Sequence, residues 1–168
     1  MLAYHIELFS NEKDRYRQHQ YLYRTFGSDI IWSICNNRII LRKNNPFEYI
    51  HSDIGIIKTR KFELDSELNF FAILNPVIKQ NKKRIPIKSI PESNSWAIDQ
   101  FIKNGIELTD ITLNHQSCIF VNKPGEKIIY NANHFIGKLK VLNEDLFLNL
   151  YCNGIGQGKA FGLGMLYI

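Results

Sequence analysis

A tyrosine and a histidine stand three residues apart near the start of the chain, at Tyr16 and His19. On a helix, that spacing sets their side chains about one turn apart and within roughly 60° of one another. An imidazole titrates near neutral pH and can donate or accept a proton, and a phenol can hydrogen-bond a reacting oxygen. A single histidine is more often a surface or packing residue. The pair alone therefore leaves both general acid–base catalysis and packing open.

The pair falls inside a stretch whose pattern predicts a helix over 11–26. Asn11 is a suitable N-cap, Asp14 stands in the predicted first turn, and a glycine follows the predicted end. At about 100° per residue, His19 lies beside the apolar stripe of this helix and Tyr16 lies to its solvent side. We therefore expect the helix to pack on a sheet and to hold His19 at the margin of that contact.

The segment GIGQGKAFGLG (154–164) holds five of the ten glycines of the chain. It follows a predicted helix and precedes a predicted strand, so a helix cap and a turn would account for it. A phosphate-binding P-loop needs a serine or threonine after its lysine, whereas Ala160 follows Lys159 here, and the order of elements is reversed. The spacing also excludes a dinucleotide-binding fingerprint. The alternative to a turn is a loop whose unshielded N–H groups, around Gly156 and Gly158, let a phosphate backbone approach closely.

The periodicity of the remaining chain gives the order of the elements. The predicted strands span 3–9, 30–35, 38–42, 54–62, 67–79, the two arms of a hairpin within 115–133, 134–141 and 162–168. The predicted helices span 11–26, 93–105 and 143–153, with a short helix or irregular segment over 46–52 and a basic loop over 80–91. Strand, helix, strand, strand, short helix, strand is the ferredoxin-like order, and it occurs twice. We therefore expect an α+β fold of two units that meet near residue 63.

Four motifs together resemble the CasE type of CRISPR repeat-processing endoribonucleases, in the RAMP superfamily. They are the terminal GIGQGKAFGLGMLYI (154–168), Asn75-Pro76 followed by KKRIPI (82–87), HFIGKLKV (134–141) and YRQH (16–19). The resemblance implies an α+β fold of two tandem ferredoxin-like domains, of the RRM or RAMP type, with antiparallel sheets. With the order of elements, it predicts an N-terminal domain over 1–62 that carries the catalytic helix. A C-terminal domain over 63–168 would carry an RNA-binding hairpin and the glycine-rich loop.

In proteins of this type the Tyr-x-x-His pair of the first helix supports RNA cleavage, so the resemblance assigns catalysis to Tyr16 and His19. RNA carries its own nucleophile, the 2′-hydroxyl beside the scissile phosphate, so the enzyme has only to move protons and stabilise the developing charge. The expected products are a 2′,3′-cyclic phosphate or 3′-phosphate and a 5′-hydroxyl, and the resemblance implies no metal and no cofactor. A cation near the phosphate would stabilise the transition state. The sequence leaves open which side chain supplies it: Arg15, Arg24, Lys159 or a hairpin lysine.

Positive charges cluster in the middle of the chain, where 79–88 holds five lysines and arginines and no acidic residue. Such a run is as readily a solvated loop, but the resemblance favours a part of the RNA path. The hairpin of 115–133 resembles one that related proteins lay against a repeat stem-loop, which they recognise mainly by shape and phosphate contacts. The expected partners are CRISPR repeat RNA, the processed crRNA and other subunits of an RNA-guided effector complex. The residues expected to contact RNA are Arg15, Arg24, Lys79, Lys82, Lys83, Arg84, Lys123, Lys127, Gly156, Gly158 and Lys159.

The composition is compatible with this function without proving it. Lysine and arginine outnumber aspartate and glutamate by 21 to 16 in the 168 residues, and the net charge of +5 permits phosphate contacts. The three cysteines are odd in number and no two are close in sequence, so neither a zinc motif nor a disulfide framework is visible, which favours a reducing compartment. No signal peptide or membrane-spanning apolar run is visible. We therefore expect a cytoplasmic protein without a membrane partner.

Two other functions stay open at the level of the sequence. A non-catalytic RNA-binding subunit of the same superfamily would keep the fold and the basic residues, while Tyr16 and His19 only pack. A general α+β protein-interaction module would use the glycines as a turn and would show no preference for structured RNA. Because phosphate contacts make affinity fall steeply with salt, a salt titration of RNA binding separates the second alternative from the rest.

Overall fold

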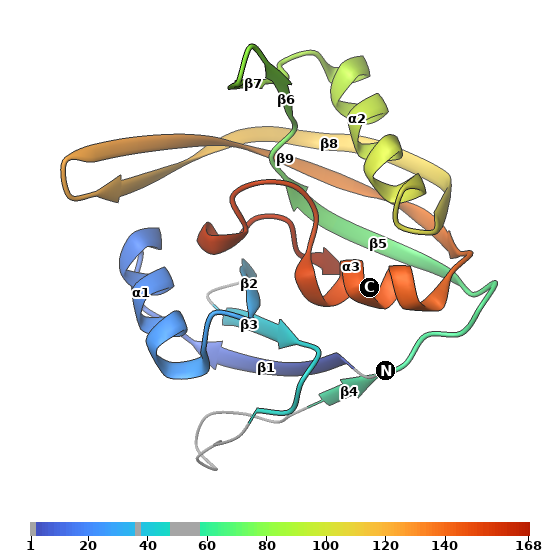
Figure 1. Cartoon of the computed structure of the whole chain (residues 1–168), viewed down its shortest axis with the longest axis horizontal. Helices are drawn as coiled ribbons and strands as arrows, with labels where there is room; N and C mark the ends of the chain where they lie inside the picture. The colour runs from blue at the N-terminus through green and yellow to red at the C-terminus, as the bar shows by residue number, and fades with distance from the viewer. Residues whose placement is uncertain (1–2, 36–37, 48–57) are drawn as a thin grey trace.

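The computed structural model describes residues 3–35, 38–47 and 58–168 of the chain. Within these residues, the chain forms two antiparallel sheets of four strands each, a short separate hairpin, and helices packed against the sheets (Figure 1). The predicted α+β fold with antiparallel sheets is confirmed. Among the same residues, no helix is both long enough and apolar enough to cross a membrane.

The first sheet contains strands from the N-terminal part of the chain, in the order β2-β3-β1-β4. Its strands are β1 (Ala3–Phe9), β2 (Ile31–Cys35), β3 (Arg38–Lys43) and β4 (Lys58–Arg60). Helix α1 (Arg15–Phe26) connects β1 to β2. It packs on the sheet through Leu22, which shares a buried core with Ile6, Trp32 and Leu41. The alternation of apolar and polar residues along the strands produces this one-sided core.

The second sheet has the order β10-β5-β9-β8. Its strands are β5 (Glu67–Leu74), β8 (Ile106–Lys123), β9 (Glu126–Val141) and β10 (Leu166–Tyr167). Helices α2 (Ile90–Ile102) and α3 (Glu144–Asn153) cover it, and Phe101 and Phe147 are buried with Phe135 of β9. When strands are counted within each unit, both sheets have the order expected of a ferredoxin-like unit. The first sheet ends at residue 60 and the second begins at 67, whereas the division into domains at 62/63 stays a prediction.

Strands β8 and β9 form one long hairpin that projects to the left in Figure 1. The sequence predicted a shorter hairpin over 115–133 followed by a separate strand over 134–141, which is wrong because β9 continues without a break through both segments. Register shifts between Leu108 and Asp110 and between Leu113 and His115 interrupt the alternation of β8. Such irregularities hide a strand from a period-two pattern, and they also bend it.

The ends of two helices differ from the predictions. The N-cap of α1 is Asp14, whose carboxylate accepts the backbone N–H groups of Tyr16 and Arg17, so the prediction of Asn11 was wrong. Aspartate is as good a cap as asparagine, and the helix begins at Arg15, directly after Asp14. Helix α2 begins at residue 90 rather than 93, because Ser89 caps it and a proline occupies its first turn, which suits the fixed φ of proline.

Three predicted segments differ in form from the structure. Most of the basic loop predicted over 80–91 belongs to a hairpin of β6 (Val77–Gln80) and β7 (Lys83–Pro86), whose two turn residues have positive φ. The predicted strand 67–79 accordingly ends at residue 74. The closing strand is limited to β10, since the glycine-rich loop extends to residue 165. Most of the segment predicted over 46–52, and the start of 54–62, lie outside the described residues.

Candidate active site

Helix α1 presents His19 on the side that faces the glycine-rich loop and the β8–β9 hairpin. The imidazole is half-buried, with its ring centroid 4.1 Å from that of Tyr23 and 5.4 Å from that of Phe161, both in edge-on contacts. Such contacts stabilise an aromatic ring in one orientation by about 0.5–1.5 kcal/mol each. The Nδ1 atom of His19 is enclosed and has no hydrogen-bond partner. Nε2 is therefore the ring nitrogen that can face a substrate.

The surroundings of His19 favour its neutral form. Burial lowers the pKa of His19 below its ordinary value, and the positive charge of Lys123 lowers it further. Both effects act in the same direction because each disfavours the protonated, positively charged imidazole. A neutral imidazole near pH 7 can accept a proton, which is the property required of a general base.

The glycine-rich loop positions Phe161 against His19. A single 3₁₀ turn, η1 (Lys159–Phe161), stands between Gly158 and Gly162, which both have a left-handed backbone. A Cβ atom on Gly162 would lie 2.7 Å from Nη1 of Arg15 and 3.1 Å from the Trp32 ring. The loop can therefore approach α1 and β2 this closely only because position 162 has no side chain.

The tip of the β8–β9 hairpin completes the site. The Nζ atom of Lys123 lies 5.5 Å from the centroid of the Phe161 ring, and the Tyr130 ring lies 5.6 Å from it on the other strand. Burial raises the pKa of Tyr130, and the nearby charge of Arg84 lowers it in part. Three segments that are far apart in the sequence thus meet around one imidazole: α1, the hairpin tip and the glycine-rich loop.

The residues that were predicted to act at the site differ in their surroundings. Tyr16 is half-buried one turn before His19, and no hydrogen bond or ring contact joins the two side chains within the described part of the chain. Of the four candidate cations, the hairpin lysine Lys123 is the one whose charge acts on His19. Arg24 is exposed in the last turn of α1, and Lys159 is exposed at the first position of η1.

Arg15, the remaining candidate, is half-buried beneath the glycine-rich loop. Its guanidinium lies 5.7 Å from the Trp32 ring, and its Nη1 atom is buried without a hydrogen-bond partner. Burial lowers the pKa of Arg15 from its high ordinary value, although an arginine keeps its charge under such conditions. Arg15 therefore supplies a fixed positive charge next to the loop.

Three aromatic residues of the site were not predicted from the sequence: Tyr23, Tyr130 and Phe161. Tyr23 follows His19 by four residues on the same helix, and this spacing could have indicated the contact. Phe161 stands inside the glycine-rich motif, where only the glycines and the lysine were considered. Nothing in the sequence marks Tyr130, because its approach depends on the length and bend of the hairpin.

Comparison with known proteins gives the context of this site. A family model described as CRISPR associated protein matches residues 6–168. The chain belongs to this family of CRISPR-associated proteins. A search of curated protein sequences finds no match.

Solved structures with the same fold include several CRISPR proteins. One is the CRISPR endoribonuclease Cse3 bound to a 19-nucleotide RNA, with a TM-score of 0.83 and 17% identity over 99% of this chain and 97% of that chain. Another is Cse3 of Thermus thermophilus bound to an RNA that represents a pre-cleavage complex, with a TM-score of 0.78 and 16% identity over 99% and 98% of the two chains. A third is Cas6e of Escherichia coli K-12, with a TM-score of 0.70 and 19% identity over 99% and 98%. At these identities the matches establish a shared fold.

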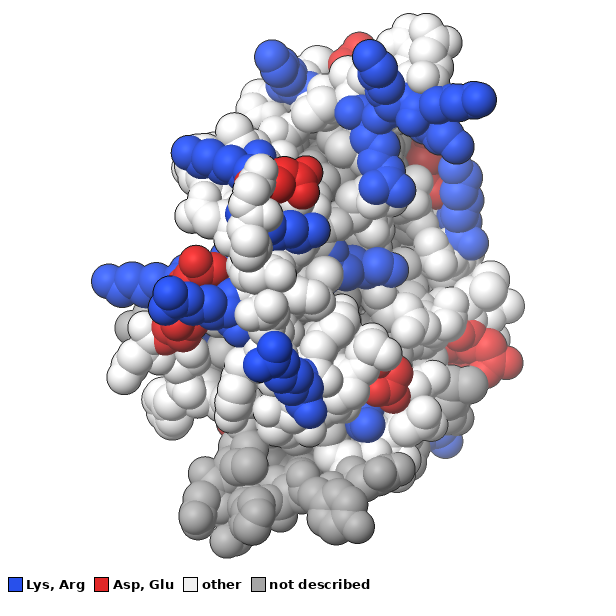
Figure 2. Space-filling view, turned by 60° about the vertical axis from the view of Figure 1, so that its left-hand side comes forward, with Lys and Arg blue, Asp and Glu red and all other residues white. Residues whose placement is uncertain are grey.

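The surface of this CRISPR-associated protein is basic around the site. Figure 2 looks toward the hairpin tip and α1. On this face, the blue lysines and arginines outnumber the red acidic residues. The blue side chains gather near the top, which is the end of the molecule where β6–β7 lies in Figure 1. The exposed cations of the run 79–88 are Lys79, Lys82, Lys83, Arg84 and Lys88. Lys127 is also exposed, with its Nζ 5.0 Å from the centroid of the Phe120 ring.

The glycines predicted to expose their backbone have a second role in this protein. A Cβ atom on Gly156 would lie 3.0 Å from Trp96, and one on Gly158 would lie 2.8 Å from Leu163, so both positions are closely packed. The amides of 161–164 donate within the loop or to β5, whereas those of 156–160 donate no backbone hydrogen bond within the described residues.

Proposed function

We propose that this protein is a metal-independent endoribonuclease that cuts CRISPR precursor RNA within its repeats by attack of a 2′-hydroxyl. Membership of the CRISPR-associated family and the fold shared with Cse3 and Cas6e support an RNA substrate of this kind. The fold alone does not define the chemistry, which has to come from the side chains of the site. The observation that carries the proposal is the half-buried His19, oriented by two aromatic rings beside a lysine.

The proposed reaction uses His19 as the general base. The imidazole removes the proton of the 2′-hydroxyl, and the 2′-oxygen forms a bond to the adjacent phosphorus. The bond between phosphorus and the 5′-oxygen breaks, and that oxygen takes up a proton from solvent. The products are a 2′,3′-cyclic phosphate and a 5′-hydroxyl, and no redox change or external cofactor is involved. The charge that develops on the phosphate oxygens is stabilised by Lys123, while Tyr16 hydrogen-bonds the 2′-oxygen.

The proposed RNA path runs from the site to the β6–β7 hairpin. Exposed cations on that hairpin and at the tip of β8–β9 fit a phosphate backbone, and the amides of 156–160 fit a phosphate near His19. A repeat stem would be recognised mainly through its shape and phosphates. The solved structures that share this fold include a CRISPR RNA-guided surveillance complex. We include in the proposal that the protein stays bound to the mature crRNA as a subunit of such a complex.

The proposal is tested with the repeat RNA of the host in the presence of EDTA. We expect cutting at one position, products with a cyclic phosphate and a 5′-hydroxyl, and no cutting when the nucleotide before the scissile phosphate is 2′-deoxy. A requirement for added metal, or cutting of the 2′-deoxy substrate, would contradict the mechanism. Tight binding of the repeat without cutting would instead identify a non-catalytic RNA-binding subunit.

A further inference from the structure

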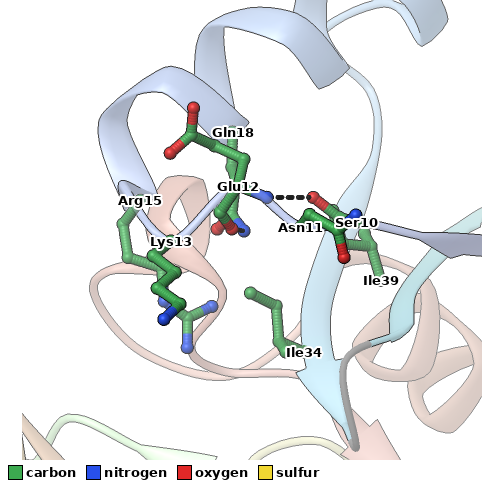
Figure 3. Close-up of a pocket in the computed structure, with 8 residues that line it drawn as sticks. All are labelled: Ser10, Asn11, Glu12, Lys13, Arg15, Gln18, Ile34 and Ile39. Carbon is green, nitrogen blue, oxygen red and sulfur yellow. Dashed lines mark hydrogen bonds between the residues drawn. The ribbon is translucent and has the colours of Figure 1, made fainter.

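A pocket of about 340 Å³ lies beside the N-terminal end of α1, next to the loop that precedes this helix and to strands β2 and β3 (Figure 3). Lys13, Arg15 and Gln18 contribute polar atoms to its lining, and Ile34 and Ile39 contribute an apolar part. The volume is at the small end of the range for ligand pockets, roughly 300–1,000 Å³. The pocket therefore fits one small group of mixed polarity.

Two buried atoms of residues in this lining have no hydrogen-bond partner. One is the acceptor Oε1 of Gln18, a residue that is only 3% exposed, and the other is the donor Nη1 of Arg15. The Nε2 group of Gln18 is already engaged, since it donates to the backbone oxygen of Glu12. Buried polar atoms in native proteins almost always have partners, because leaving them without one is costly. A ligand with a hydrogen-bond donor would satisfy Oε1 of Gln18, whereas Nη1 of Arg15 lies against Gly162 of the glycine-rich loop, which does not line the pocket.

The charges around the pocket favour an anionic ligand. Lys13 is exposed at its rim and Arg15 is fixed beneath the loop, so two cations are present. The carboxylate of Glu12 also borders the pocket, but it accepts the backbone N–H of Asp14 at 2.8 Å and lies 3.9 Å from the guanidinium of Arg17. A nucleotide has a part for each side of this pocket. Its phosphate would contact the cations, the flat face of its base would pack on the isoleucines, and the edge of its base carries hydrogen-bond donors and acceptors. Inorganic phosphate, by contrast, would offer Gln18 no such edge.

The pocket adjoins the candidate active site. Arg15 and His19 are four residues apart on α1 and therefore share one face of the helix. The same 3₁₀ segment reaches both, because Phe161 contacts His19 and the next residue, Gly162, packs against Arg15. A polynucleotide whose scissile phosphate lies at His19 would therefore bring a neighbouring nucleotide to the pocket.

We propose that this pocket binds one unpaired ribonucleotide adjacent to the scissile phosphate and selects its base. Gln18 reads the base edge, the two isoleucines contact the base face, and Lys13 contacts the phosphate. The inference rests on the proposed function for the position of the nucleotide in the substrate, while binding to the pocket itself requires no cleavage.

The test is a titration of the wild-type protein with AMP, GMP, CMP, UMP and inorganic phosphate, followed by the NMR resonance of the Gln18 side-chain amide. Concentrations up to about 10 mM suffice, because a few hydrogen bonds and one phosphate contact give a dissociation constant of roughly millimolar size. We expect one or two nucleotides to shift this resonance and to bind up to about tenfold more tightly than the others. Lys13→Ala should weaken this binding roughly threefold to tenfold, whereas Lys103→Ala, which replaces another exposed lysine at the end of α2, should leave it unchanged.

Each other result would overturn the proposal. Equal shifts with inorganic phosphate would reduce the pocket to an anion site, and equal affinity for all four nucleotides would remove base selection. No shift of the Gln18 resonance with any probe would remove the site. Failure of the proposed function would be seen separately, as intact repeat RNA in the cleavage assay, and it would not alter the result of the titration.

Discussion

Replacement of Gly164 by alanine should destabilise the protein far more than the same replacement of Gly125. Both glycines have a left-handed backbone, with φ of +83° and +77°, so alanine costs about 1–2 kcal/mol at either position from the backbone alone. A Cβ atom on Gly125 has nothing within 4 Å, whereas one on Gly164 would lie 2.4 Å from the backbone oxygen of Ile155. Gly125→Ala is therefore a matched control for the close packing of the loop.

The extra cost at Gly164 follows from the hydrogen bonds that the collision disturbs. Relief of the 2.4 Å contact requires a shift of about 1 Å toward ordinary van der Waals distance. Gly164 donates its N–H to the oxygen of Ile73 at 2.8 Å and accepts the N–H of Ile155 at 2.8 Å, and a shift of this size weakens both bonds. At about 0.5–1.5 kcal/mol for each bond, the total loss becomes about 2–5 kcal/mol, against about 1–2 kcal/mol for the control.

Urea denaturation followed by tryptophan fluorescence measures both variants. The expected result is a lower midpoint for Gly164→Ala than for Gly125→Ala, with unchanged slopes. Since the same loop carries Phe161 against His19, cleavage under conditions where the variant is folded should also fall for Gly164→Ala alone. Equal loss of stability in the two variants would refute the conclusion that close packing sets the position of this loop.

Three further changes test the charges and rings of the site. Lys123→Gln removes a positive charge that lowers the pKa of His19, so an NMR titration should show that this pKa rises. In a pH–rate profile, the loss of cleavage on acidification should then begin at a higher pH than in the wild type. An unchanged pKa would rule out Lys123 as a neighbour. Phe161→Leu removes the ring contacts with His19 and Tyr130. It should lower the single-turnover cleavage rate roughly tenfold at saturating RNA, with little change in the affinity for RNA. A change in RNA affinity alone would assign this ring to RNA binding. Lys82→Ala should reduce the slope of log affinity against log salt by about one without changing that rate, and an unchanged slope would remove this lysine from the RNA path.

Local patterns were sufficient for the order of most elements and for the position of His19 on the first helix. The ferredoxin-like order can be read from the chain because apolar periodicity and caps are properties of neighbouring residues. Helix α1 could be predicted in the same way, and so could the position of His19 beside the apolar stripe that contains the buried Leu22. The error at its start arose because Asn11 and Asp14 are both good caps, and the choice depends on tertiary packing.

The contacts around His19 could not be predicted, because they join distant parts of the chain. The approach of Lys123 depends on the length of the β8–β9 hairpin and on its two irregularities, which the alternation pattern does not reveal. The β6–β7 hairpin was missed for a related reason. Asn81 and Lys82 turn it with a left-handed backbone, and lysine is an unusual residue in that conformation.

The most direct test of the account is single-turnover cleavage of the host repeat RNA, in EDTA, by wild-type protein, His19→Ala and the control His115→Ala. His115 is an exposed histidine on β8. Its replacement by alanine removes the same chemical group as His19→Ala, but from a strand instead of from α1. The account predicts that His19→Ala still binds the repeat but cuts it roughly 10²–10⁴-fold more slowly, while His115→Ala cuts at the wild-type rate. Cleavage by His19→Ala at the wild-type rate would contradict the assignment of His19 as the general base.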